Sequence, residues 1–181
     1  MTVRTPLAPP GYRLDSVRDK SWDERRRTKA VAVTFRTSTG DPLFVIYRLE
    51  PEWVLEDAAE MSSIHCLNLL QFYPWSQPES PQPARLQADL SQEAVVPNAL
   101  RIDGQPVNSY RFVVHDVVVD MVFLPGISIG IARPANAALP DLQTGPYESL
   151  RPELPATDSG EYRGYLEERP GGNFRSYWPG G

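Results

Sequence analysis

The sequence has few of the residues that bind metals or form disulfides. Cys66 is its single cysteine, and His65 and His115 are its two histidines among 181 residues. One cysteine excludes an intramolecular disulfide and a zinc site built from cysteines. Two histidines are too few for a histidine-rich metal centre. We therefore predict that the protein holds no metal and no cofactor.

Long apolar runs are also missing. A membrane-spanning helix needs about 18 uninterrupted apolar residues. The best stretch, residues 113–124, is interrupted by His115, Asp116 and Asp120. The opening residues, MTVRTPLAPPGYR, lack the apolar core of a secretory signal. The sequence therefore predicts a soluble, cytoplasmic protein without a membrane partner.

The signatures of common enzymes are absent as well. Gly126 and Gly130 flank a predicted strand and neither precedes a helix, so a glycine-rich phosphate loop is not expected. No serine lies in a G-x-S-x-G motif. Cys66 and His65 are adjacent on a predicted helix, where neighbouring side chains point about 100° apart and cannot form a dyad. Because these signatures are absent, we predict no catalytic residue and favour a protein that is not an enzyme.

Alternating apolar residues are the clearest pattern that is present. Residues 31–49 alternate on both sides of a turn cluster at residues 38–42 and predict a β-hairpin. Residues 100–132 predict several further strands, with either a turn or a bulge at residues 115–116. One side of the best-patterned strand carries Val117, Val119, Met121 and Phe123. These stretches predict a mostly antiparallel sheet.

Residues 51–73 form the one main helix that the sequence predicts. Positions at helical spacing place apolar side chains on one face, with Cys66 near its centre, and Pro74 ends the helix. A second, short helix is predicted to begin at Ser21, because Glu24 three residues later completes a capping box. The main helix is expected to pack its apolar face on the sheet, which makes the fold class α+β.

Proline is abundant, with 19 residues, roughly twice the usual share. The prolines gather outside the apolar stretches, so they predict loops and extended arms. We expect an N-terminal arm at residues 1–12, a single globular domain at residues 13–133 and a Pro/Gly/aromatic-rich extension at residues 134–181. Residues 84–96 fit either a strand or a short helix.

Charge is distributed unevenly along the chain. Residues 1–48 carry ten Lys and Arg against five Asp and Glu, whereas residues 49–181 carry eight against eighteen. A basic cluster near the start consists of Trp22, Arg25, Arg26 and Arg27. Such a cluster can bind nucleic acid, but its acidic neighbours and the net charge of −5 do not favour that partner.

Two other surfaces are candidates for contact with a protein. The predicted main helix carries an acidic group, which consists of Glu56, Asp57 and Glu60. The C-terminal extension carries aromatic residues between arginines, namely Tyr162, Tyr165, Phe174, Tyr177 and Trp178. Aromatic and arginine side chains are frequent interface anchors. The extension could equally cover an edge of its own sheet.

These observations favour a non-enzymatic protein-binding module, such as an adaptor, an assembly factor, an immunity-type inhibitor or a structural subunit. Its partner would be another protein or a second copy of the chain. The first alternative is a small-ligand or enzymatic pocket in a curved sheet, built from Tyr110, His115, Asp120 and Arg133. The second alternative is weak nucleic-acid binding through Arg25, Arg26 and Arg27.

Overall fold

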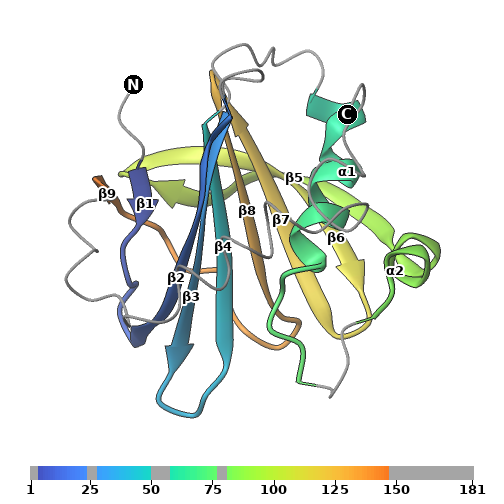
Figure 1. The fold of residues 1–181 in the computed structure, drawn as a ribbon, viewed down its shortest axis with the longest axis horizontal. Coiled ribbons are helices and arrows are strands. Elements are labelled where there is room, and N and C mark those ends of the chain that lie inside the picture. Colours follow the sequence, from blue (N-terminus) through green and yellow to red (C-terminus); the bar gives the residue numbers. More distant parts are fainter. Residues whose placement is uncertain (1–3, 24–27, 50–57, 77–80, 147–181) are drawn as a thin grey trace.

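The computed structural model describes residues 4–23, 28–49, 58–76 and 81–146 (Figure 1). Its main element is a seven-stranded antiparallel sheet in the order β2-β3-β4-β8-β7-β6-β5. The strands are β2 (Tyr12–Asp23), β3 (Thr28–Thr37), β4 (Pro42–Leu49), β5 (Ser91–Ile102), β6 (Gln105–Val114), β7 (Val117–Leu124) and β8 (Ile127–Pro134). The hairpin predicted for residues 31–49 and the strands predicted within residues 100–132 are confirmed.

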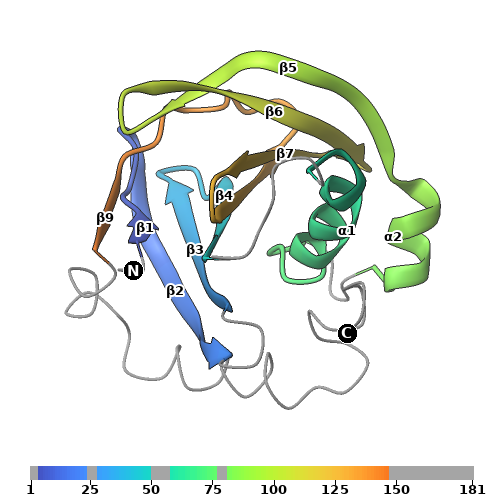
Figure 2. The same cartoon turned by 90° about the horizontal axis from the view of Figure 1, so that it is seen from above.

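Both faces of the sheet are covered by other elements. Helix α1 (Ala58–Leu70) packs on one face, against β6, β7 and β8. A two-stranded ribbon of β1 (Arg4–Pro6) and β9 (Thr144–Pro146) lies on the other side, where β1 contacts β3 and β4. Figure 2 shows β5 and β6 arching across the molecule, so the sheet is strongly curved.

The alternation of side chains along the strands produces two apolar cores. On β7, Val117, Val119 and Met121 belong to the core beneath α1, whereas Val122 belongs to the core on the opposite face. The second core also holds Leu142 from the segment before β9. A sheet with both faces buried explains why several strands are apolar at nearly every position.

Gly130 on β8 allows α1 to approach the sheet closely. A Cβ atom at this position would collide with Cδ1 of Leu69 and lie 3.1 Å from Sδ of Met121. Leu69 is only 1% exposed, so its side chain has little room to move away. The predicted apolar face of the helix is buried here, and Cys66 and Leu70 are fully inside the core.

The helices differ from the prediction in several ways. The described part of α1 ends at Leu70, and residues 51–57 of the predicted helix lie outside the described residues. A second helix, α2 (Pro83–Asp89), precedes β5, so the stretch at residues 84–96 is divided between helix and strand. Among the described residues, no helix is long and apolar enough to cross a membrane.

The short helix predicted to begin at Ser21 is wrong. Ser21 lies in β2, and the ladder between β2 and β3 continues as far as the pair Asp23 and Thr28. Strand pairing along this edge therefore outweighs the local capping pattern, which is worth only about 1 kcal/mol.

The described parts of the two predicted arms, residues 4–12 and 134–146, are more ordered than the prediction of extended arms implies. Nε of Arg4 donates a hydrogen bond to Oγ1 of Thr144, and the backbone N–H of Thr144 donates to Asp103 at 2.7 Å. Residues 4–6 and 144–146 thus belong to the folded body. The domain boundaries at residues 12 and 133 stay predictions.

Candidate functional site

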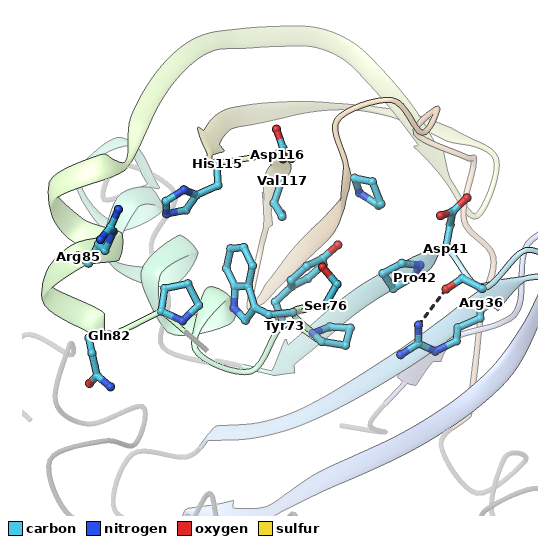
Figure 3. Close-up of a pocket in the computed structure, with 15 residues that line it drawn as sticks. Arg36, Asp41, Pro42, Tyr73, Ser76, Gln82, Arg85, His115, Asp116 and Val117 are labelled. Atoms are coloured by element: carbon cyan, nitrogen blue, oxygen red, sulfur yellow. Dashed lines mark hydrogen bonds between the residues drawn. The ribbon is translucent and has the colours of Figure 1, made fainter. Parts of the chain in front are cut away.

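A cleft of about 810 Å³ opens at the end of the sheet that holds the β3–β4 and β6–β7 turns (Figure 3). We call it the turn-end cleft. Its lining comes from both turns, from the segment after α1, from the start of α2 and from the end of β8. The lining residues are Arg36, Gly40, Asp41, Pro42, Tyr73, Pro74, Trp75, Ser76, Pro81, Gln82, Arg85, His115, Asp116, Val117 and Pro134.

Two fixed aromatic rings stand in the turn-end cleft. Nε1 of Trp75 donates a 2.9 Å hydrogen bond to the carbonyl of Leu70 at the end of α1. The ring of Tyr73 contacts Trp75 edge-to-face, with centroids 5.0 Å apart. Burial raises the pKa of Tyr73 to about 12, Arg36 opposes that shift and Asp41 adds to it. The Tyr73 hydroxyl is therefore neutral and remains able to donate a hydrogen bond.

His115 is held at the edge of the turn-end cleft by contacts on two sides. Its backbone has a φ of +51°, which the two-residue turn between β6 and β7 requires. Its Nε2 lies 3.3 Å from Oδ2 of Asp89, and Nε of Arg85 lies 3.4 Å from the same oxygen. Its ring also meets Trp75 edge-to-face, with centroids 6.2 Å apart. Asp89 therefore connects α2 to the β6–β7 turn.

The charges of the turn-end cleft do not balance. Nε of Arg36 lies 3.0 Å from Oδ2 of Asp15, and Arg85 pairs with Asp89, so an aspartate neutralises each arginine. In contrast, Asp41 and Asp116 have no cationic partner among the residues that the structure describes. Figure 3 shows Arg36 and Asp41 on one side, with Arg85 and His115 on the other. The turn-end cleft thus favours a positively charged ligand.

The pocket predicted from Tyr110, His115, Asp120 and Arg133 is not assembled as one group. Asp120 is fully buried and accepts hydrogen bonds from Ser109 at 2.6 Å and from Arg133 at 2.5 Å. Tyr110 instead packs against Phe123 on the side of α1, with centroids 5.9 Å apart. His115 lies in the turn-end cleft. Asp120 therefore does not line a pocket around His115.

The environment of Asp120 is a buried ion cluster. Nε of Arg111 lies 3.0 Å from Oδ1, on the side opposite Arg133. The sequence contained a signal for this cluster, because a turn at residues 115–116 places Arg111 directly opposite Asp120. Two arginines around one aspartate neutralise its charge and satisfy its oxygens, which makes complete burial tolerable. We assign this cluster to the scaffold.

Cys66 and His65 are both inside the core, as the helical pattern indicated for the cysteine. Burial, with a contribution from Asp120, raises the pKa of the Cys66 thiol well above its usual value. Burial, reinforced by Arg48, lowers the pKa of His65 well below its usual value. Both groups are therefore neutral near pH 7, and neither reaches the turn-end cleft.

The other predicted contact surfaces remain untested. Trp22 and Glu60 lie in β2 and α1, but their side chains are outside the described part of the structure. The remaining residues of these surfaces lie entirely outside it: Arg25, Arg26, Arg27, Glu56, Asp57, Tyr162, Tyr165, Phe174, Tyr177 and Trp178. Within the described ranges, no three His, Cys, Asp or Glu side chains are grouped to hold a metal ion.

Sequence reasoning missed the aromatic part of the turn-end cleft. Trp75 follows Pro74 in a proline-rich loop, and a large aromatic residue in such a loop was the available signal.

Comparison with known proteins adds no functional assignment for the turn-end cleft. No family model, no curated protein and no solved structure shows a significant similarity to this chain.

Proposed function

We propose that the protein is a non-enzymatic protein-binding module, and that the turn-end cleft is where an extended polypeptide segment of its partner docks. The observation that carries the proposal is the fixed Trp75 ring within a cleft of about 810 Å³. Tryptophan and tyrosine are the commonest anchors of protein interfaces. Because α1 and the neighbouring rings hold Trp75 in place, little side-chain entropy is lost when a partner binds.

The exposure of the lining residues favours a polypeptide over a small molecule. Ser76, Gln82, Arg85, His115 and Asp116 are all exposed. A ligand in the turn-end cleft would therefore keep one side in water, as a docked peptide does. Small-molecule sites bury most of their ligand's surface. Aromatic-lined grooves are also the usual receptors for extended, proline-containing segments, and Tyr73 and Trp75 line this one.

The chemistry of the turn-end cleft favours binding over catalysis. Ser76 supplies a hydroxyl and His115 an imidazole, but these two side chains make no hydrogen bond to each other. His115 is instead engaged by Asp89, which lies outside the lining. An activated nucleophile needs a base within hydrogen-bond reach. One observation favours the small-ligand alternative. The volume of the turn-end cleft, about 810 Å³, lies in the usual range of ligand pockets, about 300–1,000 Å³.

Peptide selection with a blocking variant tests the proposal. Peptides are selected from a random displayed library against the full chain, and their affinities are measured by fluorescence anisotropy. Ser76→Arg fills the turn-end cleft from an exposed position, whereas Gln105→Arg adds the same charge at the far end of β6. We expect Ser76→Arg to weaken binding about tenfold or more, a loss of at least about 1.4 kcal/mol.

The control variant Gln105→Arg should bind the same peptides as the unmodified chain. Selected peptides that bind all three proteins equally would contradict a peptide site in the turn-end cleft. A screen of small organic cations, run on the same three proteins, addresses the alternative. If a cation binds the unmodified chain and Gln105→Arg but not Ser76→Arg, and no peptide is selected, then the ligand of the turn-end cleft is a small molecule and not a peptide.

A further inference from the structure

We propose that the polypeptide segment which docks in the turn-end cleft is proline-containing and basic, with a backbone carbonyl bonded to the hydroxyl of Tyr73 and a cationic side chain beside Asp41. This inference rests on the proposed function, because it names the kind of segment that the same site would select. It identifies Tyr73 and Asp41 as the residues that determine this selection.

The hydroxyl of Tyr73 is a polar group that the fold leaves without a partner. Tyr73 is only 6% exposed, and it lines the turn-end cleft. Edge-to-face contacts fix its ring against Phe44, with centroids 6.4 Å apart, and against Trp75. No hydrogen bond joins its hydroxyl to any residue that the structure describes. Buried tyrosines usually have such a partner, so we expect the ligand to supply it.

This hydroxyl favours a backbone carbonyl as the ligand group that it binds. Because burial raises the pKa of Tyr73 to about 12, the hydroxyl keeps its proton near pH 7 and can donate it. The indole N–H of Trp75 is already used, since it donates to the carbonyl of Leu70. Tyr73 is therefore the aromatic donor that remains for the ligand. Carbonyls of a polyproline II segment are available as acceptors, because that conformation has no internal hydrogen bonds.

The arrangement of the two aromatic rings favours proline in the segment. The rings of Tyr73 and Trp75 meet at an interplanar angle of 75°, with centroids 5.0 Å apart. Two nearly perpendicular rings form a corner with apolar walls. A proline ring is compact and apolar, and its fixed φ reduces the entropy that the segment loses on binding. Proline-rich segments that dock in aromatic-lined grooves use the same advantage.

The β3–β4 turn holds the carboxylate of Asp41 beside this corner. The backbone N–H of Asp41 donates to Oγ1 of Thr37 at 3.1 Å, and Oγ1 of Thr39 donates to its Oδ2 at 3.2 Å. Burial is the main cause of the raised pKa of Tyr73, and Asp41 adds to it, so the charge of Asp41 reaches the hydroxyl. A basic side chain next to the carbonyl that Tyr73 binds can therefore pair with Asp41.

Arg36 lines the same side of the turn-end cleft but does not neutralise Asp41. Its Nε pairs with Asp15 at 3.0 Å, and its Nη1 donates to the carbonyl of Gly40 at 2.9 Å, the bond that the dashed line in Figure 3 marks. Within the described ranges, no cation lies within ion-pair distance of Asp41. The carboxylate is therefore open to a cation from the ligand.

The composition of selected peptides is the first test. The probe is the random displayed library used for the proposed function, selected against the full chain. We expect enrichment of proline, and of Arg or Lys at a constant distance from that proline. Replacing the proline by Ala, or the basic residue by Gln, should weaken binding several-fold. Selected peptides that lack either enrichment would overturn the inference.

Tyr73→Phe is the second test, because it removes only the hydroxyl. We expect it to weaken the binding of selected peptides about two- to tenfold, the usual effect of one lost hydrogen bond. The urea midpoint should not change, since the hydroxyl has no described partner to lose. Tyr47→Phe, which alters a buried tyrosine in the core on the opposite face, should leave peptide affinity unchanged. Unchanged affinity in Tyr73→Phe, or a loss matched by a lower midpoint, would overturn the role of Tyr73.

Asp41→Asn is the third test, because it removes the charge and keeps the size of the side chain. We expect peptides with the basic residue to bind about two- to fivefold more weakly, as for other exposed ion pairs. The same peptides with Gln in place of the basic residue should bind Asp41→Asn and the unmodified chain equally well. An equal loss for both kinds of peptide would overturn the pairing with Asp41.

Ser76→Arg separates this inference from the proposed function. If selected peptides depend on Ser76 but lack proline and a basic residue, or bind Tyr73→Phe as tightly as the unmodified chain, the inferred selection fails while the peptide site stands. If no selected peptide depends on Ser76, both fail.

Discussion

Asp120 and Arg133 form an ion pair in the interior, with Oδ2 and Nη1 2.5 Å apart and the aspartate fully buried. They come from the neighbouring strands β7 and β8, and Arg111 from β6 approaches the other carboxylate oxygen at 3.0 Å. One buried side chain thus joins three adjacent strands. Its removal leaves two arginines without their common counter-charge.

We predict that Asp120→Ala lowers the free energy of unfolding by about 3–5 kcal/mol, because it leaves the buried Arg133 and the partly buried Arg111 without their counter-charge. Urea denaturation followed by circular dichroism measures the loss. The exposed pair of Arg36 and Asp15 provides a matched comparison, and Asp15→Ala should cost at most about 1 kcal/mol. Equal effects of the two substitutions would show that the Asp120 cluster is not a buried ion network.

Gly130→Ala should destabilise the contact between the sheet and α1 by about 1–3 kcal/mol, because the new methyl group overlaps the buried side chain of Leu69. Thermal and urea unfolding report the change. Leu69→Ala makes room for the methyl group, so the double variant should be more stable than the sum of the two single effects predicts. Strict additivity would mean that the two residues do not compete for space.

Stability should fall as the pH is lowered through the range in which a free histidine gains its proton, around a pKa of about 6.5. Burial, with help from Arg48, keeps the pKa of His65 well below that value in the folded state, so the unfolded chain binds the proton first. The contribution of His65 is therefore fully present above about pH 6.5 and declines below it, by up to about 1.4 kcal/mol per pH unit.

Urea denaturation at a series of pH values between neutral and mildly acidic measures this dependence. His65→Leu removes the titrating group, and the slope in this range should become flatter. His115→Ala serves as the comparison, because His115 is exposed at the turn-end cleft. A slope unchanged by His65→Leu would assign the acid sensitivity to other groups.

Cys66 should be unreactive towards thiol reagents in the native protein. Its side chain is fully buried, and burial raises the pKa of its thiol well above the usual value, so little thiolate exists to react. Colorimetric thiol titration should detect Cys66 only after urea is added. A thiol introduced by Gln105→Cys, at an exposed position of β6, should react at once, and rapid reaction at both positions without denaturant would contradict the buried placement of Cys66.

The strands were predictable because their apolar period of two continues across both hairpins. The positions of Val117, Val119 and Met121 on one side of β7 follow from that period alone. The pattern at Ser21 was misleading, because a local capping box competes with strand pairing that only the tertiary fold supplies. Burial of Asp120 was hidden for a similar reason, since its two arginine partners come from other strands.

The candidate site was predictable only in part. His115 stood out as the polar residue at a turn, and it does line the turn-end cleft. Arg36, Tyr73 and Arg85 carry no distinctive local pattern, and they converge only because the sheet brings the β3–β4 turn and the end of α1 to the same edge. A single sequence reveals periodicity along an element, but not which loops from distant elements meet.

The ribbon of β1 and β9 joins residues that are about 140 positions apart, with Arg4 bonded to Thr144. During synthesis, β1 emerges first and has no partner until residues 144–146 follow. Leu142, which fills the core on the same side, also arrives late. That core therefore stays uncovered until nearly the whole body has left the ribosome, a period in which exposed strands risk pairing with other chains. Folding from such distant contacts is expected to be slow, and chaperones are expected to bind the nascent chain before β9 arrives.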